Sequence, residues 1–485
     1  MAYDDLQQFI AALDDAGELK RISVEVDPEL EISEIVDRCC KSEPRGPALL
    51  FEKVKGSEIP LLINALGSYR RMCLALGVGS FDDLADRLQQ LIKPEIPTTL
   101  IEKLKKLPQL GQIASFAPKL QRDGLCQQVI KRGQDINLNE LPIIKCWPED
   151  AGRFITLGQV HTVDPKTSQR NAGLYRLQVI DKQTCAIHWQ LHHDGARHHR
   201  QYVELNQEMP MAVVLGADPT LTYAASAPLP EALDELFFSG FIRQQSVPLV
   251  QCASVDLQVP ADAEVVIEGT VQPDETILEG PFGDHTGYYS LADQYPVFHV
   301  TAVTHRQNPV YPTTIVGYPP MEDEWIGKAT ERIFLPLLKM FIPEAVDYNL
   351  PVWGVFHNFC FISIKKAWPY HARKVMNAVW GLGQMSLCKF VVVVDEDIDV
   401  QKPEHVWFEV GANVDPKRDI VIMPGITDVL DHAAAVTGVG SKIGIDATRK
   451  WKSEGAGHDW PKKIVMDDET KALVDRRWQE YGFLG

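Results

Sequence analysis

The sequence contains no long hydrophobic run. No apolar stretch approaches the ~20 residues that a transmembrane helix requires. The segment MAYDDLQQFI at the start is acidic, whereas a signal peptide begins with basic residues. These absences exclude a membrane-spanning or secreted chain and predict a cytoplasmic protein.

Clusters of basic residues are missing as well. The chain has 48 Lys and Arg against 66 Asp and Glu, which gives a formal net charge of −18. Binding to nucleic acid depends on a positive surface that neutralises phosphates. We therefore expect no nucleic acid among the partners of this protein.

Cysteine is present, but not in the spacing of a disulfide framework or a zinc site. The nine cysteines are odd in number, include no C-x-x-C pair and lie largely in apolar runs. This usage predicts reduced, buried thiols in a cytoplasmic protein.

The length of 485 residues predicts two or three domains. Residues 1–118 alternate helix and strand signals, as in a small α/β domain. Apolar residues recur at helical spacing from Leu6 to Leu13, and Ser80 is placed to cap the helix that follows it. The other elements expected here are a helix from Glu31 to Cys40 and strands at Ala48–Phe51 and Leu61–Asn64. A Pro- and Lys-rich stretch, Lys93–Lys119, is the expected connector to the next domain.

Residues 119–313 contain many short β-prone runs separated by turn signals. This pattern predicts a barrel or sandwich rather than βαβ units. The runs are Thr156–Val163, Leu174–Ile180, Ala212–Leu215, Leu249–Ala253, Glu264–Val271 and Val297–Val303.

Residues 314–485 return to alternating helices and strands, which predicts a second α/β domain. The expected helices are Ile333–Phe341 and Val375–Met385, and the expected strands are Phe359–Ile364, Phe390–Val394 and Ile420–Met423. A terminal helix, Glu469–Tyr481, carries an apolar stripe on an otherwise charged segment.

The segment Leu278–Tyr289 is the first candidate for chemistry. Its glycines and proline predict a structured loop that turns Glu279 and Asp284 inward. Two carboxylates that share an apolar site repel each other, so one of them acquires a raised pKa and can act as an acid near neutral pH. The alternative is a solvated turn whose acids cap backbone amides.

A second candidate is the segment Arg170–Arg176. If the strand bends at Gly173, Asn171 and Arg176 converge, and an arginine is suited to hold a carboxylate through two hydrogen bonds. The alternative is an exposed arginine on a barrel strand.

The third candidate segment, Ile187–His199, is rich in histidine. His188 and His192 are four residues apart, a zinc spacing only on a helix. The neighbouring residues favour a strand, where this spacing separates the rings by ~13 Å. A zinc site is therefore disfavoured, while one histidine in a mixed Asn/His/Glu site for a harder metal stays open. We expect His193, His198 and His199 in a surface loop.

A glycine-rich stretch, Gly438–Asp446, matches neither of the phosphate-binding spacings, G-x-G-x-x-G and the P-loop. We therefore assign it no phosphate role.

Taken together, these segments resemble the UbiD family of decarboxylases. The matching motifs occur in the family's order and span nearly the whole chain. They are Pro47–Phe51, Cys146–Asp150, Asn171 with Arg176, Leu215–Pro219, Glu279–Tyr289 and Gly440–Trp451.

The resemblance implies a fold and a set of cofactors. The fold is an N-terminal α/β region, a central flavin-reductase-like split β-barrel and a C-terminal α/β domain that serves in oligomerisation. The cofactors are prenylated FMN, a manganese ion at its phosphate and often a potassium ion. The reaction is the release of carbon dioxide from an aromatic or α,β-unsaturated acid.

The resemblance also implies residue roles. Arg176, Glu279 and Asp284 correspond to the catalytic network, in which one acid passes a proton to the substrate carbon. This step needs a neutral carboxylic acid, which burial beside Leu278 and Phe282 would provide. The metal ligands would be Asn171, Glu235 and His188, with His192 as the alternative to His188. The residues that would surround the cofactor are Leu174, Tyr175, Arg176, His188, Trp189, Gln190, His193 and Asp194.

Substrate and partners are expectations by analogy. The leading substrate is a 3-polyprenyl-4-hydroxybenzoate or related quinone precursor, reached through a transient contact with the membrane. A flavin prenyltransferase would supply the cofactor, and the terminal helix would join subunits into a dimer or hexamer. The alternatives are a (de)carboxylase of aromatic degradation and a catalytically silent flavin-binding scaffold.

Overall fold

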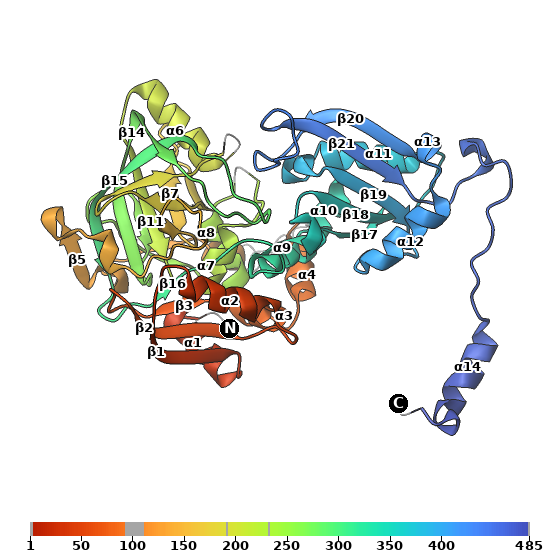
Figure 1. Ribbon diagram of the computed structural model, residues 1–485, viewed down its shortest axis with the longest axis horizontal. Coiled ribbons are helices and arrows are strands. Elements are labelled where there is room, and N and C mark those ends of the chain that lie inside the picture. Colours follow the sequence, from red (N-terminus) through yellow and green to blue (C-terminus); the bar gives the residue numbers. More distant parts are fainter. Residues whose placement is uncertain (1–2, 93–110, 191–192, 231–232, 484–485) are drawn as a thin grey trace, which may run out of the picture.

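The computed structural model describes residues 3–92, 111–190, 193–230 and 233–483. Figure 1 shows the N-terminal elements below a large curled sheet and a second, separate sheet formed by the C-terminal third of the chain. Most of the expected connector between the first two parts lies outside the described residues.

The N-terminal part is a four-stranded sheet with helices packed on it. The strand order is β1-β2-β3-β16, so the chain returns to this sheet after it leaves the central part. The strands are β1 (Leu19–Val26), β2 (Ala48–Val54), β3 (Leu61–Ile63) and β16 (Tyr311–Pro312), and the helices are α1 (Leu6–Asp15), α2 (Glu31–Lys41), α3 (Tyr69–Leu76) and α4 (Phe81–Ile92). The stripe from Leu6 to Leu13 is buried, as its helical spacing predicts.

The central part is a nine-stranded sheet that curls into a half-barrel. Its order is β6-β9-β10-β15-β14-β11-β7-β8, and β5 pairs with β15. The strands are β5 (Val129–Arg132), β6 (Phe154–Ile155), β7 (Gln159–Val163), β8 (Arg170–Leu174), β9 (Leu177–Val179), β10 (Thr184–Ile187), β11 (Met209–Leu215), β14 (Val265–Glu279) and β15 (Asp293–His305). A smaller sheet of β4 (Lys119–Leu120), β12 (Pro248–Gln251) and β13 (Gln258–Pro260) lies beside it. The expected barrel-type fold is confirmed.

The longest hairpin of the sheet differs from the expectation. The strand predicted to end at Val271 continues as β14 to Glu279, and β15 begins at Asp293. The β14–β15 loop, residues 280–292, is therefore the turn of this hairpin, and Glu279 is the last residue of a strand.

Three helices of the central part were not predicted. They are α6 (Asp194–Leu205), α7 (Pro219–Ala224) and α8 (Glu235–Arg243). The prediction that His198 and His199 lie in a surface loop was wrong, because both are in α6. His198 is fully buried, and its Nδ1 lies 2.9 Å from the hydroxyl of Thr162. His193 is the residue that precedes the helix.

The C-terminal part is a five-stranded sheet of order β17-β18-β19-β21-β20. Its strands are β17 (Ala345–Asn349), β18 (Phe359–Ile364), β19 (Phe390–Asp395), β20 (Ile420–Ile426) and β21 (Val439–Asp446), and its helices are α9 (Asp323–Ile333), α10 (Leu335–Phe341), α11 (His371–Trp380), α12 (Pro403–Asn413) and α13 (Pro416–Asp419). The glycine-rich stretch Gly438–Asp446 forms strand β21.

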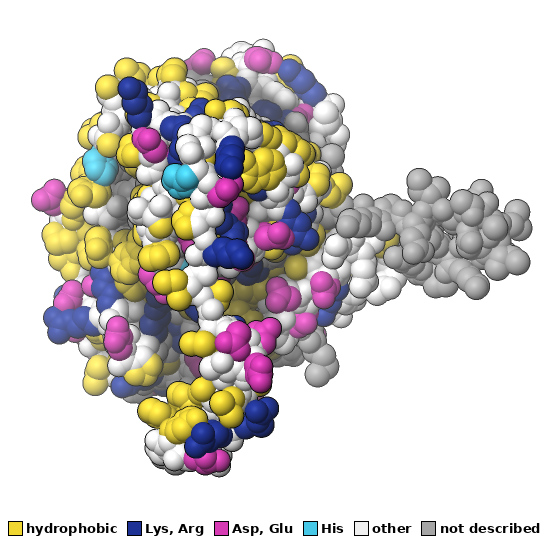
Figure 2. All heavy atoms as spheres, turned by 90° about the vertical axis from the view of Figure 1, so that its right-hand side faces the viewer, with side chains coloured by type: hydrophobic (Ala, Val, Ile, Leu, Met, Phe, Trp, Pro, Cys, Tyr) yellow, Lys and Arg dark blue, Asp and Glu magenta, His cyan; other side chains and the backbone are white. Residues whose placement is uncertain are grey.

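The end of the chain stands apart from this sheet. Helix α14 (Asp468–Arg477) has no buried residue and projects away from the body of the molecule in Figure 1. Its stripe is open: Leu473 is 43 %, Trp478 is 42 % and Tyr481 is 44 % exposed. Figure 2, viewed from this side, shows hydrophobic side chains gathered on the segment at the lower end of the molecule.

The cysteines follow the prediction: all nine are free thiols, and all except Cys39 are buried. Among the helices of the described residues, none combines the length and apolar character needed to cross a bilayer.

Candidate active site

Arg176 is the centre of a buried ion cluster. It lies between β8 and β9, and its guanidinium donates to both acids that the sequence singled out. Its Nε is 2.8 Å from one Glu279 oxygen and its Nη2 is 3.2 Å from the other, while its Nη1 donates to Asp284. The three side chains are at most 9 % exposed. The predicted inward turn of both acids is therefore present, and both meet Arg176.

Short-range packing fixes the loop that carries Asp284. The carboxylate of Asp150 accepts hydrogen bonds from the backbone N–H of Gly283 at 2.7 Å and of Trp147 at 2.8 Å. Gly283 lies so close to the Trp147 ring that an added Cβ would come within 2.2 Å of it. Gly280, at φ +87°, makes the turn at the end of β14 with a conformation that favours glycine. The motif Cys146–Asp150 therefore supports the β14–β15 loop.

The electrostatics of the acids differ from the prediction. Burial acts to raise the pKa of Glu279, but hydrogen bonds from His188 and Arg176 outweigh it and place the pKa below its ordinary value. Burial likewise acts to raise the pKa of Asp284, but the hydrogen bond from His285 and the charge of Arg176 bring it well below. The expected raised pKa was wrong, because the hydrogen bonds from His188 and His285 and the charge of Arg176 stabilise both carboxylates.

The expected apolar shield is also only half present. Phe282 is 2 % exposed, and the guanidinium carbon of Arg176 lies 4.6 Å from the centre of its ring. Leu278 is 56 % exposed. Phe282 therefore packs on the cation, and Leu278 does not cover either acid.

His188 belongs to the same cluster. Its Nδ1 is 3.0 Å from Nη2 of Arg176 and 3.1 Å from Glu279, and its ring packs on Tyr295 at 4.3 Å. Among the described residues, no recorded contact joins His188 to Asn171 or Glu235. The structure thus places this predicted metal ligand beside the acids. His192, the alternative, lies outside the described residues.

Asn171 and Glu235 form a second, separate cluster. Asn171 is on β8, and Glu235 opens α8 and accepts from the backbone N–H of Ala172 at 3.0 Å. Burial raises the pKa of Glu235 to about 7. The side-chain nitrogen of Asn171 is buried with no hydrogen-bond partner among the described residues.

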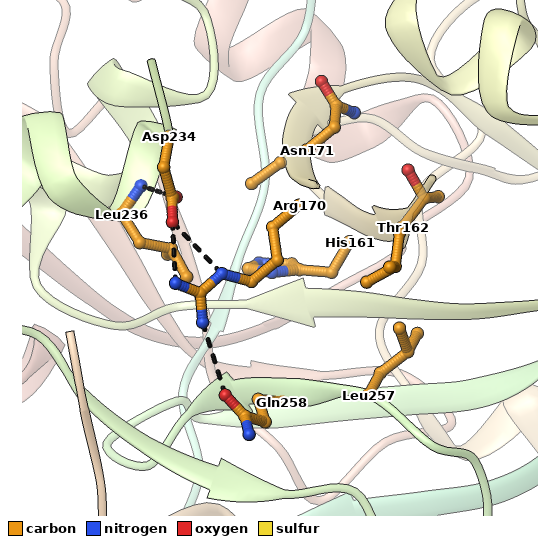
Figure 3. A pocket seen from close by; sticks show the side chains of 10 residues that line it. His161, Thr162, Arg170, Asn171, Asp234, Leu236, Leu257 and Gln258 are labelled. Atoms are coloured by element: carbon orange, nitrogen blue, oxygen red, sulfur yellow. Dashed lines mark hydrogen bonds and ion pairs between the residues drawn. The ribbon is translucent and has the colours of Figure 1, made fainter. Parts of the chain in front are cut away.

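A small cavity of about 10 Å³ adjoins these residues. Figure 3 shows Arg170 crossing it to Asp234, at 2.8 Å, and to Gln258. Asp234 also caps α8 through the backbone N–H of Leu236. This ion pair anchors the start of α8, and so the position of Glu235, against β8.

The residues expected around the cofactor gather near Tyr175. Its ring lies 4.9 Å from that of His193 and 6.4 Å from that of Trp189, and its hydroxyl lies near the side chain of Asn171. Gly195 packs against both aromatic rings. His193 therefore packs on Tyr175 near Asn171, and His161 lines the cavity that adjoins Asn171.

The other residues expected around the cofactor, Leu174, Gln190 and Asp194, bond to neighbouring residues of the chain. Leu174 donates its backbone N–H to Ala225, and the backbone N–H of Gln190 donates to Nδ1 of His193. Asp194 opens α6 and pairs with Arg197 at 2.9 Å.

The buried polar atoms fit a bound polar ligand. His188 Nε2, Trp189 Nε1 and Asn171 Nδ2 all lack a hydrogen-bond partner within the part of the chain that the structure describes. Such atoms are costly unless a ligand or water pairs with them. In the described residues, no three His, Cys, Asp or Glu side chains are arranged to hold a metal, so a metal here needs the Asn171 amide as well.

Sequence reasoning missed His285 and His357. His285 lies within the recognised motif, directly after Asp284, and its Nδ1 is 2.8 Å from Asp284. His357 lies far along the chain, in the C-terminal part, and its Nε2 is 3.1 Å from Nε2 of His285. No sequence signal marks His357.

Three family models match most of the chain. They describe the 3-octaprenyl-4-hydroxybenzoate carboxy-lyase N-terminal domain, at residues 10–89, its Rift-related domain, at 119–319, and its C-terminal domain, at 324–447. The chain belongs to the UbiD family. The family and the solved structures that resemble the chain are carboxy-lyases, and the chain is an enzyme of this class.

Two relatives match the chain along nearly its whole length. An uncharacterized protein of Aquifex aeolicus is 51 % identical over 481 residues, and one of Archaeoglobus fulgidus is 50 % identical over 482, with 99 % of each chain covered.

Among solved structures, vanillic acid decarboxylase of Sedimentibacter hydroxybenzoicus is 27 % identical, with 99 % of both chains covered. Its TM-score is 0.87 in the closed form and 0.80 in the open form. The UbiD-class enzyme HmfF of Pelotomaculum thermopropionicum, in complex with FMN, is 29 % identical with a TM-score of 0.79, covering 97 % of this chain and 99 % of that one. An evolved dimeric form of HmfF, in complex with prenylated FMN, is 28 % identical with a TM-score of 0.77, covering 97 % and 98 %.

Proposed function

We propose that this protein removes carbon dioxide from a hydroxylated aromatic acid with the help of prenylated FMN. The observation that carries the proposal is the buried cluster in which Arg176 holds Glu279 and Asp284 on two sides. A guanidinium in this setting can transfer one of its hydrogen bonds to a substrate carboxylate and orient it.

The residues divide the work between orientation and proton transfer. Glu279 fixes the plane of Arg176 through two hydrogen bonds, at 2.8 and 3.2 Å. Asp284 sits on the other edge of the guanidinium and can pass a proton to the carbon that loses carbon dioxide. Bound prenylated FMN would supply the electron sink for this step.

The second cluster would hold the cofactor. Asn171 and Glu235 offer oxygen ligands to a manganese ion at the cofactor phosphate, a donor set that suits this metal better than zinc. We assign the histidine of this site to His193, which packs on Tyr175 beside Asn171. His188 Nε2 and Trp189 Nε1 are free to bind the cofactor itself. A potassium ion stays a prediction of the resemblance.

The substrate we favour is a 4-hydroxybenzoate with a prenyl chain. Apolar side chains around the β14–β15 loop support a hydrophobic substrate: Leu278 is 56 %, Tyr288 is 61 % and Leu291 is 84 % exposed. Such a chain could be taken up during a transient contact with a membrane. The second candidate is a degradative enzyme for small phenolic acids, since vanillic acid decarboxylase is among the similar structures.

The test uses protein co-produced with a flavin prenyltransferase, the partner that would supply the cofactor. Decarboxylation of 4-hydroxybenzoate with and without a 3-prenyl chain, and of vanillate, is followed by chromatography, and cofactor content by absorbance. Preference for the prenylated acid supports the favoured substrate, and preference for vanillate supports the degradative candidate. No turnover of any acid by protein with a full complement of cofactor would leave the silent flavin-binding scaffold.

A further inference from the structure

The proton that ends on the substrate carbon needs a source in addition to Asp284. Decarboxylation replaces a carboxylate by hydrogen, so each turnover consumes one proton at that carbon. Hydrogen bonds from His188 and Arg176 lower the pKa of Glu279, and the hydrogen bond from His285 with the charge of Arg176 lowers that of Asp284, so both acids are carboxylates at neutral pH. A neighbouring group has to protonate Asp284.

His285 is placed to be that group. Its Nδ1 lies 2.8 Å from one Asp284 oxygen, while Arg176 donates to the other. Its side chain is 24 % exposed, so the ring also reaches solvent.

His285 also contacts the C-terminal part of the molecule. Its Nε2 faces Nε2 of His357 at 3.1 Å. Two ring nitrogens at this distance share a single proton, so one ring donates and the other accepts. If His285 donates at both nitrogens it is an imidazolium, and His357 is then neutral with its proton on Nδ1.

The charges around the two rings favour this arrangement. Burial acts to lower the pKa of His285, but the hydrogen bond and charge of Asp284, with Asp323 of α9 and Asp428 between β20 and β21, raise it to about 9. Burial and the charge of His285 lower the pKa of His357 to about 4, against the opposing charges of Asp428, Asp431 and Asp284. Burial raises the pKa of Asp323 to about 7. The pair therefore carries one positive charge at neutral pH, and it lies on His285.

The contact joins the β14–β15 loop to the C-terminal part. Tyr288 of the β14–β15 loop packs on His432 of the C-terminal part at 4.1 Å. The chain is more similar to the closed form of vanillic acid decarboxylase than to its open form. The His285–His357 contact is thus present in a structure that resembles the closed form.

We propose that His285 supplies the proton that Asp284 delivers, and that His357 positions His285 for this step when the C-terminal part closes over the β14–β15 loop. The inference rests on the proposed decarboxylase function. When a substrate carboxylate takes over the Arg176 hydrogen bond, the charge that helps to lower the pKa of Asp284 is withdrawn. The Nδ1 proton of His285 then passes to Asp284, and from Asp284 to the carbon as carbon dioxide leaves. His285 is then neutral, with its proton on Nε2, and regains one on Nδ1 from water when the parts separate.

The kinetic test compares four variants of the cofactor-loaded enzyme. His285→Gln keeps a hydrogen bond to Asp284 but cannot supply a proton, so kcat should fall by about 10²-fold or more, the usual effect of removing a positioned acid. His357→Phe removes the acceptor for Nε2 and should lower kcat about tenfold, a smaller loss than removing the proton donor itself. His357→Gln restores an acceptor and should recover most of that loss. His432→Gln is the control, because His432 packs at the same interface without contacting His285.

The pH profile separates proton supply from a structural role. Wild-type kcat should fall above pH of about 9, where His285 loses its proton. This alkaline limb should disappear in His285→Gln and move to lower pH in His357→Phe. An unchanged limb in His285→Gln, or equal losses for His357→Phe and His432→Gln, would overturn the proposal.

Nuclear magnetic resonance of ¹⁵N-histidine-labelled, cofactor-free protein tests the pair without any turnover. We expect His285 to be doubly protonated at pH 7.5 and to titrate at lower pH in His357→Phe. An ordinary titration near pH 6.5 contradicts the proposal. A wild type that turns over no acid, but shows the coupled titration, overturns the decarboxylase function and with it the role in catalysis, while the charged pair itself stands.

Discussion

The two clusters of the site differ in how complete they are without a ligand. Around Arg176, every hydrogen-bonding atom of the guanidinium faces a carboxylate, a histidine or the hydroxyl of Ser290. Around Asn171 and Glu235, the side-chain nitrogen of Asn171 has no hydrogen-bond partner among the described residues, and burial raises the pKa of Glu235 to about 7. The first cluster is therefore preorganised by the protein, whereas the second is built to be completed by something that binds.

Breaking the cluster around Arg176 should lower the stability of the protein more than any other change considered. Arg176→Ala leaves two buried carboxylates without their cation, and the loss of one partner of a buried pair costs about 3–5 kcal/mol. The midpoint of denaturant unfolding should fall clearly. Arg170→Ala is the matched comparison: its pair with Asp234 is 32 % and 22 % exposed, so its loss should cost less than that of Arg176, which is 9 % exposed. Equal shifts for the two variants would contradict the distinction between the clusters.

Glu279→Gln tests the complete cluster for function rather than stability. It should lower decarboxylation by about 10²–10⁴-fold, the usual effect of removing a positioned acid or base. Exchange of hydrogen for deuterium at the product carbon should be lost with it, while cofactor absorbance persists. Because the residues act as one unit, the Glu279/Asp284 double variant should be hardly worse than either single variant. Near-wild-type turnover by Glu279→Gln would remove this residue from the mechanism.

Through the cluster of Asn171 and Glu235, the stability of the protein should instead depend on metal and pH. The pKa of Glu235 is raised from 4.5 to about 7, so the metal-free protein gains stability from this group below pH 4.5 and loses it as the pH rises through 7. Added manganese should reverse this trend, because it binds the ionised carboxylate of Glu235. The affinity of the protein for manganese should fall about tenfold for each pH unit below 7. Thermal unfolding with and without manganese, from pH 5 to 8, measures both.

Glu235 variants provide the control for that measurement. Glu235→Gln should abolish the pH dependence, and Glu235→Ala should lose cofactor absorbance on desalting. A Glu235→Ala protein that keeps its full complement of cofactor would show that the metal assignment is wrong.

The contrast between the clusters also shows what the sequence could predict. The residues Arg176, Glu279 and Asp284 were recognisable from motifs, and their convergence follows from a hairpin turn rich in glycine. The direction in which the pKa values of the two acids shift could not be recognised from the sequence, because it depends on which edges of Arg176 the acids contact. His357 could not be found either, since its role arises only from the approach of two separately folded parts.

The fold, too, was predictable from the sequence only in part. Periodic segments such as Leu6–Leu13 predicted their helices, because burial follows spacing. Helix α6 was missed, since its buried face includes Gly195 and His198, which carry no hydrophobic signal. The third metal ligand stays a prediction: His188 lies 3.1 Å from Glu279, and its alternative, His192, lies outside the described residues.

Changes at the end of the chain are expected to affect the two clusters least. Helix α14 has no buried residue, and the stripe of Leu473, with Trp478 and Tyr481 in the turn after the helix, is exposed apart from local contacts such as Trp478 on Phe483. We expect the stripe to pack against a neighbouring subunit, because exposed apolar side chains grouped on one helix face are typical of an interface.

Truncation after Met466 should reduce the mass measured by light scattering, with little change in kcat or in the midpoint of unfolding of the body. Trp478→Asp, placed within the stripe, should act in the same way, while Lys471→Asp on the charged face should leave the assembly intact. An unchanged mass for both the truncation and Trp478→Asp would place the subunit contacts elsewhere and leave both clusters of the site independent of assembly.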